Sequence, residues 1–243
     1  MQCHAENGVA QHETKTMSTK SYYSSYPKFH MAVDCIIFGF EEGGLSLLLQ
    51  KRNFEPAMGE WSLMGGFVEE GESVDDAARR VLTNLTGLKD IYMRQVKAYG
   101  EVERDPGERV ISAAYYALID INKQDKELIK AHNAFWVKLD ELPHLIFDHD
   151  QMVADALSVM REKALSKPTG INLLPEEFTL TQLQSLYEAI LGEEIDKRNF
   201  RKRLAEMDYI EKTGHIDKLL SRRGAALYRL NPEKYSKDSK FKI

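Results

Sequence analysis

The chain has 243 residues, of which 43% are hydrophobic and 29% are charged, and its formal net charge is −5. This composition is typical of a globular protein and excludes a disordered or collagen-like chain. Two cysteines are too few for a disulfide framework, and no run approaches the roughly 20 apolar residues that a membrane helix needs. We therefore expect a cytoplasmic protein without membrane contact. Residues 1–24 lack the apolar run of a secretory signal and are expected to form a mobile leader, in which Met17 could be the true start.

The charges are distributed unevenly along the chain. Residues 1–170 carry 19 basic and 26 acidic side chains, whereas residues 197–243 carry 14 basic and 6 acidic ones. A basic segment can bind nucleic acid, because each phosphate that it neutralises releases counterions. A solvated basic helix would give the same count. The asymmetry therefore indicates two units with different partners, without showing by itself that the second binds DNA.

Alternating β-type and helical patterns fill residues 31–165. Apolar runs at 31–38 and 45–52 flank a glycine pair and predict a hairpin, and further strands are expected at 60–68, 91–99, 109–121 and 135–142. Apolar residues between Val74 and Leu85 recur at helical spacing, with Ser73 and Asp76 as a capping pair and Gly87 as the end. A second helix is expected at 150–165 before a Pro-Gly break. These elements predict an α/β domain over residues 25–168.

Residues 169–243 have a different pattern. Thr179 and Gln182 have capping-box spacing before an apolar helical face that ends at Gly192. Asp196 can cap a second helix over 197–210, with Phe200, Leu204 and Met207 pointing inward. A turn, a basic stretch at 221–224 and a strand at 225–230 follow. Two helices closed by a basic hairpin predict a winged helix-turn-helix domain.

The second helix and the hairpin supply the expected contacts to operator double-stranded DNA. The helix would lie in the major groove with its first turns near the base edges, while the hairpin would reach phosphates or the minor groove. The candidate DNA-binding residues are Lys197, Arg198, Asn199, Arg201 and Lys202 on the helix, and Arg222 and Arg223 on the hairpin.

The loop and helix over 66–88 resemble the Nudix box, a signature of nucleoside-diphosphate hydrolases. The chain keeps Gly66, Glu72, Arg80 and Gly87 at the spacing of the motif. Where the family places three metal-binding glutamates, it has Val81, Asn84 and Leu85 instead. Val and Leu offer no oxygen, so the Mg²⁺ that would activate water has no box site. We expect no metal, no cofactor and no catalytic residue, with Glu72 pairing with Arg80 to hold the loop. We expect Glu69 and Glu70 to lie in a solvated acidic loop. If the domain did bind a metal ion, a carboxylate elsewhere, such as Glu101 or Glu103, would have to replace the lost ligands.

A Nudix-like body followed by a winged helix resembles the Nudix-related transcriptional regulators of bacteria over residues 28–235, including the stretch TLTQLQSLYEAILGEEIDKRNFRKRL. The resemblance implies an α/β/α sandwich with a mixed sheet, no hydrolase activity, and a homodimer whose first domain senses a small molecule. One branch of the family senses ADP-ribose and another senses L-arabinose. The alternatives from other classes are an active Nudix hydrolase with an unusual metal site and a protein-interaction module.

The effector is expected over the sheet of the first domain, near Gly65 and Gly66. A metal-free diphosphate would need several cations, whereas a neutral sugar needs carboxylates, amides and an aromatic face such as Trp61 or Tyr99. The acidic body fits a sugar better, so L-arabinose is the first expectation and ADP-ribose the alternative. The candidate effector-binding residues are His30, Asp34, Lys51, Arg52, Glu101, Arg104 and Asp105.

Overall fold

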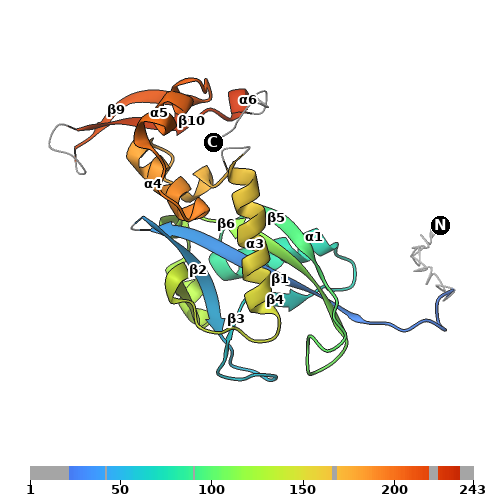
Figure 1. The fold of residues 1–243 in the computed structure, drawn as a ribbon. Coiled ribbons are helices and arrows are strands. Elements are labelled where there is room, and N and C mark those ends of the chain that lie inside the picture. The colour runs from blue at the N-terminus through green and yellow to red at the C-terminus, as the bar shows by residue number, and fades with distance from the viewer. Residues whose placement is uncertain (1–21, 42, 90, 166–168, 219–223, 236–243) are drawn as a thin grey trace, which may run out of the picture.

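The computed structural model describes residues 22–41, 43–89, 91–165, 169–218 and 224–235. It contains a large unit, built around one twisted sheet, and a smaller unit at one end of it (Figure 1). Residues 22–24, the described part of the expected leader, are exposed.

The large sheet has seven strands and is mixed, as predicted. The central strand β1 runs parallel to β6 and antiparallel to β2 and β4, while β5 forms an edge beside β6. Two further strands, β3 and β7, pair with β2. The strands are β1 (His30–Glu41), β2 (Gly44–Lys51), β3 (Trp61–Ser62), β4 (Met64–Phe67), β5 (Tyr92–Tyr99), β6 (Val110–Leu118) and β7 (Ala134–Lys138).

One helix covers each face of this sheet. Alternate residues of β1 point to opposite faces, so that Cys35 and Ile37 pack with α1 (Val74–Thr86) while Ile36 and Phe38 pack on the side of α3 (His149–Ala164). The two faces thus form two apolar layers, which confirms the α/β/α sandwich.

Both ends of α1 follow from its sequence. The Ser73 hydroxyl accepts a hydrogen bond from the backbone of Asp76, and Gly87 ends the helix in the left-handed region at φ 73°. Both features are as predicted. Four short helical segments connect the larger elements, namely 3₁₀ turns at 121–123, 139–141 and 171–173 and the helix α2 (Lys126–Ala131).

The smaller unit has the helices and three-stranded sheet of a winged helix. The capping box of Thr179 and Gln182 begins α4, Gly192 ends it at φ 77°, and the Asp196 side chain caps α5 through the backbone of Asn199. These features are also as predicted. The elements are β8 (Phe178–Thr179), α4 (Leu180–Leu191), α5 (Lys197–Ala205), β9 (Ile210–Asp217), β10 (Ala225–Leu230) and α6 (Pro232–Tyr235).

Two details of this unit differ from the predictions. The helix α5 ends at Ala205 rather than near residue 210, and Met207 lies beyond it, partly buried against the core. Residues 212–217, expected to form a turn, continue the strand β9 opposite β10. A mostly polar strand whose side chains are largely exposed has no apolar alternation to reveal it.

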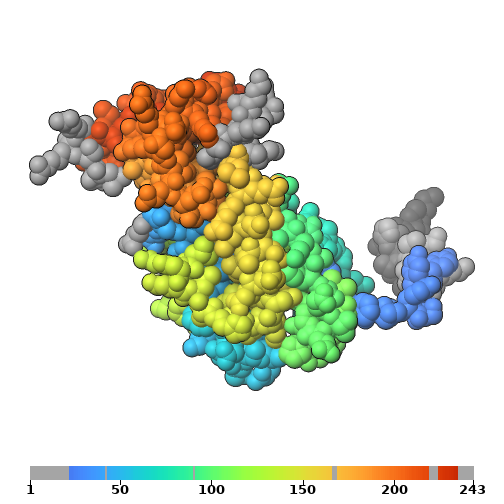
Figure 2. All heavy atoms as spheres, in the orientation of Figure 1, coloured from blue at the N-terminus to red at the C-terminus, as the bar shows by residue number. Residues whose placement is uncertain are grey.

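The two units share one hydrophobic cluster. Met160 of α3, Leu186 of α4 and Phe38 of β1 all belong to it. The connector at 169–175 is part of this packing, because Ile171, Leu173 and Leu174 are buried. Figure 2 shows the winged unit directly against the end of α3 and the large unit. The division at residue 168 remains a prediction.

Candidate effector pocket and DNA-binding surface

The surface of α5 is strongly basic. Phe200 and Leu204 are buried and anchor one side of the helix, and Phe200 lies against the ring of Tyr187 with centroids 5.8 Å apart. All five predicted DNA-binding residues of this helix are exposed on its other sides, as is Arg203: Lys197, Arg198, Asn199, Arg201 and Lys202. A cationic face on a helix that is packed from behind can enter a groove without losing core contacts.

The hairpin of β9 and β10 lies in the same unit as α5 (Figure 1). Its strands pair antiparallel from Ile210 with Leu230 to Asp217 with Ala225. The predicted wing residues Arg222 and Arg223 lie outside the described residues, so their contact with DNA stays a prediction.

A buried polar cluster lies where β1, β6, α3 and the loop 100–109 meet. Asp34 accepts a hydrogen bond of 2.6 Å from the hydroxyl of Ser112. The side chain of Arg104 is only 3% exposed and donates two hydrogen bonds of 2.7 and 2.8 Å to Asp148, while its guanidinium is 3.5 Å from Asp34. Although burial disfavours the charged guanidinium, Asp148 and Asp34 outweigh it and raise the pKa of Arg104. Two predicted effector residues, Asp34 and Arg104, are thus in one cluster.

His149 completes this cluster. Its Nδ1 accepts a hydrogen bond of 3.1 Å from the backbone N–H of Leu63, and its Nε2 is 3.7 Å from Asp34. Burial lowers the pKa of His149, more strongly than the charges of Asp34 and Asp148 raise it. The imidazole is therefore neutral at neutral pH. Gly65 closes the cluster, since a Cβ there would lie 2.5 Å from the Asp34 carboxylate.

Two further predicted effector residues, Arg52 and Asp105, lie close to this cluster. Arg52 is half-buried, its Nε donates to the carbonyl of Pro56 at 2.8 Å, and its guanidinium lies 4.1 Å from the ring centre of Phe54. Burial lowers its pKa, while the carboxylates of Asp105 and Asp34 act in the opposite direction. The carboxylate of Asp105 also accepts a hydrogen bond from the backbone of Gly107.

Among the described residues, no hydrogen bond or ion pair joins the side chains of the remaining effector candidates to this cluster. His30 is exposed and pairs with Glu108 at 2.7 Å, and Glu101 is also exposed. Lys51 lies 5.8 Å from the ring centre of Trp61. Tyr99, considered as a stacking face, is buried and donates to Asp155.

Sequence reasoning missed Asp148, His149 and Ser112. They are far from Asp34 in sequence, at separations of up to 115 positions, and no local motif marks them. The only available signal was the start of the predicted helix at residue 150, where acidic side chains are common.

The remnant of the Nudix box keeps the residues that hold its loop in place. Arg80 donates two hydrogen bonds to Glu72, at 2.6 and 3.0 Å, and a third of 2.9 Å to the carbonyl of Phe67. The hydrogen bonds from Arg80 lower the pKa of Glu72 to about 2. The predicted pair therefore fastens the loop to both α1 and β4.

The residues at the metal positions of the box do not fit a metal ion. Val81 and Leu85 are buried in the apolar layer between α1 and the sheet, and only Asn84 is exposed. Within the described ranges, no three His, Cys, Asp or Glu side chains are grouped so that they could hold a metal. Glu101 and Glu103 are both exposed. Among the described residues, the lost carboxylates are therefore not replaced by another group of metal ligands.

Comparison with known proteins agrees with this architecture. Residues 28–157 match the model of the NUDIX domain, and residues 170–230 match the NrtR DNA-binding winged helix domain. The chain is 34% identical over 216 residues to the ADPR responsive transcriptional repressor NtrR of Acinetobacter baylyi, covering 87% of this chain and 86% of the repressor.

A solved structure and a second relative extend the comparison. The structure of Shewanella oneidensis NrtR bound to a 27mer DNA superposes with a TM-score of 0.78 at 30% identity, covering 87% of this chain and 97% of that one. The ADP-ribose pyrophosphatase of Methanocaldococcus jannaschii is 35% identical over 133 residues, covering 55% of this chain and 76% of the enzyme.

A Nudix domain joined to a DNA-binding winged helix domain is the architecture of a DNA-binding regulator. The chain belongs to the family of Nudix-related transcriptional regulators with an NrtR-type winged helix. This confirms the predicted family and fold. The described residues contain no helix long and apolar enough to cross a membrane.

Proposed function

We propose that the protein is a transcriptional repressor that binds operator DNA through α5 and the β9–β10 hairpin, and whose DNA binding responds to ADP-ribose. The exposed cationic face of α5, anchored by Phe200 and Leu204, is the observation that carries DNA binding. Support for the effector is the described ADPR response of the Acinetobacter relative, whose match extends over both units. The comparisons therefore favour the ADP-ribose alternative over the L-arabinose that we expected first.

The effector would bind at the cluster of Asp34 and Arg104, near Gly65. A pentose is the second candidate, because Asp148 and Asp34 already compensate the charge of Arg104. A site whose cation is paired offers carboxylate acceptors for sugar hydroxyls and little free positive charge for a diphosphate.

Fluorescence anisotropy with the full chain and a duplex from upstream of its own gene tests this proposal. We expect ADP-ribose to change the operator affinity at least tenfold and L-arabinose to leave it unchanged. A response to L-arabinose alone would establish the second candidate, and a response to neither would reject both effectors. Failure to bind any duplex from that region would reject the regulator.

The Nudix domain is proposed to lack hydrolase activity. Val81 and Leu85 are buried and carry no side-chain oxygen, so these two positions of the box offer no carboxylate to a metal ion. We expect no release of AMP from ADP-ribose with Mg²⁺ present. Turnover on the order of 1 per second or faster would contradict the proposal, since that rate is typical of enzymes.

We also propose that the protein acts as a homodimer, with the large unit supplying most of the interface. A two-fold protein can bind both halves of a palindromic operator, which doubles a small winged-helix contact. Light scattering at micromolar concentration should give twice the mass of the 27.9 kDa chain. A monomer both with and without operator DNA would contradict it.

A further inference from the structure

A cavity lies on the opposite side of the large unit from the Asp34 cluster. It is an open hollow of about 570 Å³ between α1 and the edge strand β5. Its polar walls come from Asp75 and Arg79 on α1, Arg94 on β5 and Tyr115 on β6. Three separate elements therefore converge on one hollow, none of which supplies a residue of the predicted effector set.

Two arginines of this cavity differ from the other arginines of the large unit. Five arginines between residues 22 and 165 donate hydrogen bonds to protein oxygens: Arg52, Arg80, Arg104, Arg109 and Arg161. The other two, Arg79 and Arg94, are exposed and have no hydrogen bond or ion pair among the described residues. Scattered solvated arginines would be unremarkable, but both of these line the same cavity.

The single carboxylate among the cavity residues is already engaged. The hydroxyl of Tyr115 donates a short hydrogen bond to Asp75, and the ring of Tyr115 is buried, so this pair is fixed in place. Burial, followed by the hydrogen bond to Asp75, raises the pKa of Tyr115, which keeps the hydroxyl protonated as the donor. The residues that line the cavity therefore carry two positive charges, on Arg79 and Arg94, and one negative charge, on Asp75. This local excess of positive charge contrasts with the net charge of −7 of residues 1–170.

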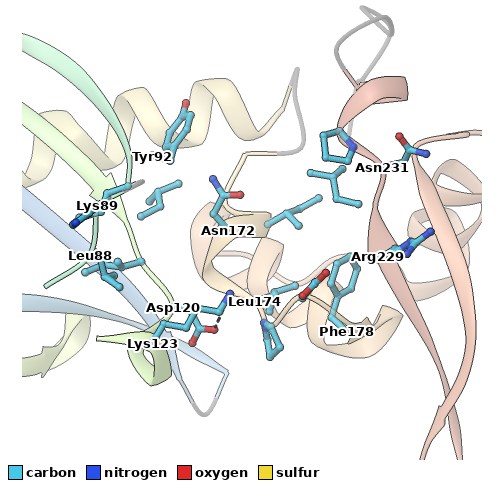
Figure 3. A pocket seen from close by; sticks show the side chains of 18 of the residues that line it. Leu88, Lys89, Tyr92, Asp120, Lys123, Asn172, Leu174, Phe178, Arg229 and Asn231 are labelled. Carbon is cyan, nitrogen blue, oxygen red and sulfur yellow. Dashed lines mark ion pairs between the residues drawn. The ribbon is translucent and has the colours of Figure 1, made fainter. Parts of the chain in front are cut away.

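A larger cavity adjoins this one on the side of the winged unit. Ile91 and Tyr92 line both cavities, and the larger one, of about 970 Å³, is shown in Figure 3. The walls of the larger cavity come from the large unit at Leu88, from the connector at Asn172 and from the winged unit at Phe178 (Figure 3). Each of the two volumes falls within the 300–1,000 Å³ that ligand pockets commonly measure, and the shared residues Ile91 and Tyr92 place the two cavities side by side.

We propose that Arg79 and Arg94 bind the phosphate group of a small metabolite, whose remaining part extends into the cavity between the two units. Guanidinium groups bind phosphate oxygens through paired hydrogen bonds, and Arg79 and Arg94 line one hollow without a hydrogen bond or ion pair among the described residues. The site adds to the proposed function and does not depend on ADP-ribose being the effector. A ligand there would contact both units and could therefore change the position of the winged unit relative to the large unit.

Calorimetric titration of the full chain with inorganic phosphate, pyrophosphate and ADP-ribose tests the site. The variant Arg79→Gln with Arg94→Gln should bind pyrophosphate at least tenfold more weakly than the wild type. The matched control is Lys126→Gln with Lys130→Gln, which removes the same charge from exposed positions of α2 and should change the affinity less than twofold. Because all four side chains are exposed, each variant should melt at the wild-type temperature.

The outcomes separate this inference from the proposed effector. Equal losses in the arginine variant and its control would show a general charge effect and overturn the site, as would unchanged binding in the arginine variant. A wild-type chain that binds neither phosphate nor pyrophosphate at 10 mM would also overturn it. Pyrophosphate binding that requires the arginines, without any effect of ADP-ribose on operator affinity, would support the site and reject ADP-ribose as the effector.

Discussion

Replacing Arg104 with methionine tests whether the buried cluster holds the large unit together. The guanidinium is almost fully buried, donates twice to Asp148 and lies 3.5 Å from Asp34. Methionine fills much of the same volume but leaves two carboxylates without their cation. Removing one partner of a buried ion pair costs about 3–5 kcal/mol. Because the Asp148 side chain is 23% exposed and remains partly hydrated, we expect the lower end, about 3 kcal/mol.

Urea unfolding followed by circular dichroism measures this cost. With a slope of about 3 kcal/mol per molar urea, the midpoint should fall by about 1 M. The double variant Arg104→Met with Asp148→Asn should recover part of the loss, because it removes one uncompensated charge. Arg79→Met is the matched control, since that arginine is exposed, and should change stability by less than about 0.5 kcal/mol. A loss below about 1 kcal/mol in Arg104→Met, or no recovery in the double variant, would refute the reasoning.

Three further predictions concern pH and DNA. Burial lowers the pKa of His149 below its ordinary 6.5, so the unfolded chain takes up the proton at a higher pH than the folded chain does. The free energy of unfolding should therefore fall as the pH drops below about 6.5. In a plot of urea midpoint against pH, His149→Gln should flatten this decrease. The pKa of Glu72 is lowered from 4.5 to about 2, so its carboxylate stabilises the fold above pH 4.5 and loses this effect as the pH falls toward 2. The variant Glu72→Gln should therefore be less stable than the wild type at pH 7 and as stable as the wild type near pH 2. Arg201→Ala should weaken operator binding by about 1–3 kcal/mol, measured by anisotropy. If Arg201 contacts a phosphate, the slope of log affinity against log salt concentration should also fall by about 1. Unchanged affinity and an unchanged slope would show that α5 is not the helix that contacts the operator.

Local signals in the sequence were enough to predict most of the fold. Caps at Ser73, Thr179 and Asp196 and glycines at 87 and 192 mark helix ends through contacts that span at most four residues. The strand β9 was not predicted, because its residues are largely exposed and show no alternation of apolar and polar side chains. The end of α5 was placed too late because Met207 fits the helical spacing although it packs from the turn beyond the helix.

The site was less predictable because its contacts join distant segments. Asp34 could be placed on the α3 side of the sheet, since it alternates with Ile36 and Phe38 along β1. The pairing of Arg104 with Asp148 depends on how the loop 100–109 folds over the sheet, and this is set by tertiary packing. Arg104 stays a candidate to bind the effector, but the sequence did not show that Asp148 and Asp34 compensate its charge within the protein.

The position of α3 bears on how a ligand could act on DNA binding. Asp148 and His149 at its beginning belong to the buried cluster, while Arg161 near its end donates a hydrogen bond of 2.9 Å to the carbonyl of Ile190 in the last turn of α4. This 16-residue helix spans about 24 Å, and a close-packed core such as the one around it transmits strain. A ligand that separates Arg104 from Asp148 would therefore displace the same helix that supports α4. Since α4 leads through a short turn into α5, the displacement would reach the DNA-binding helix without crossing a flexible linker.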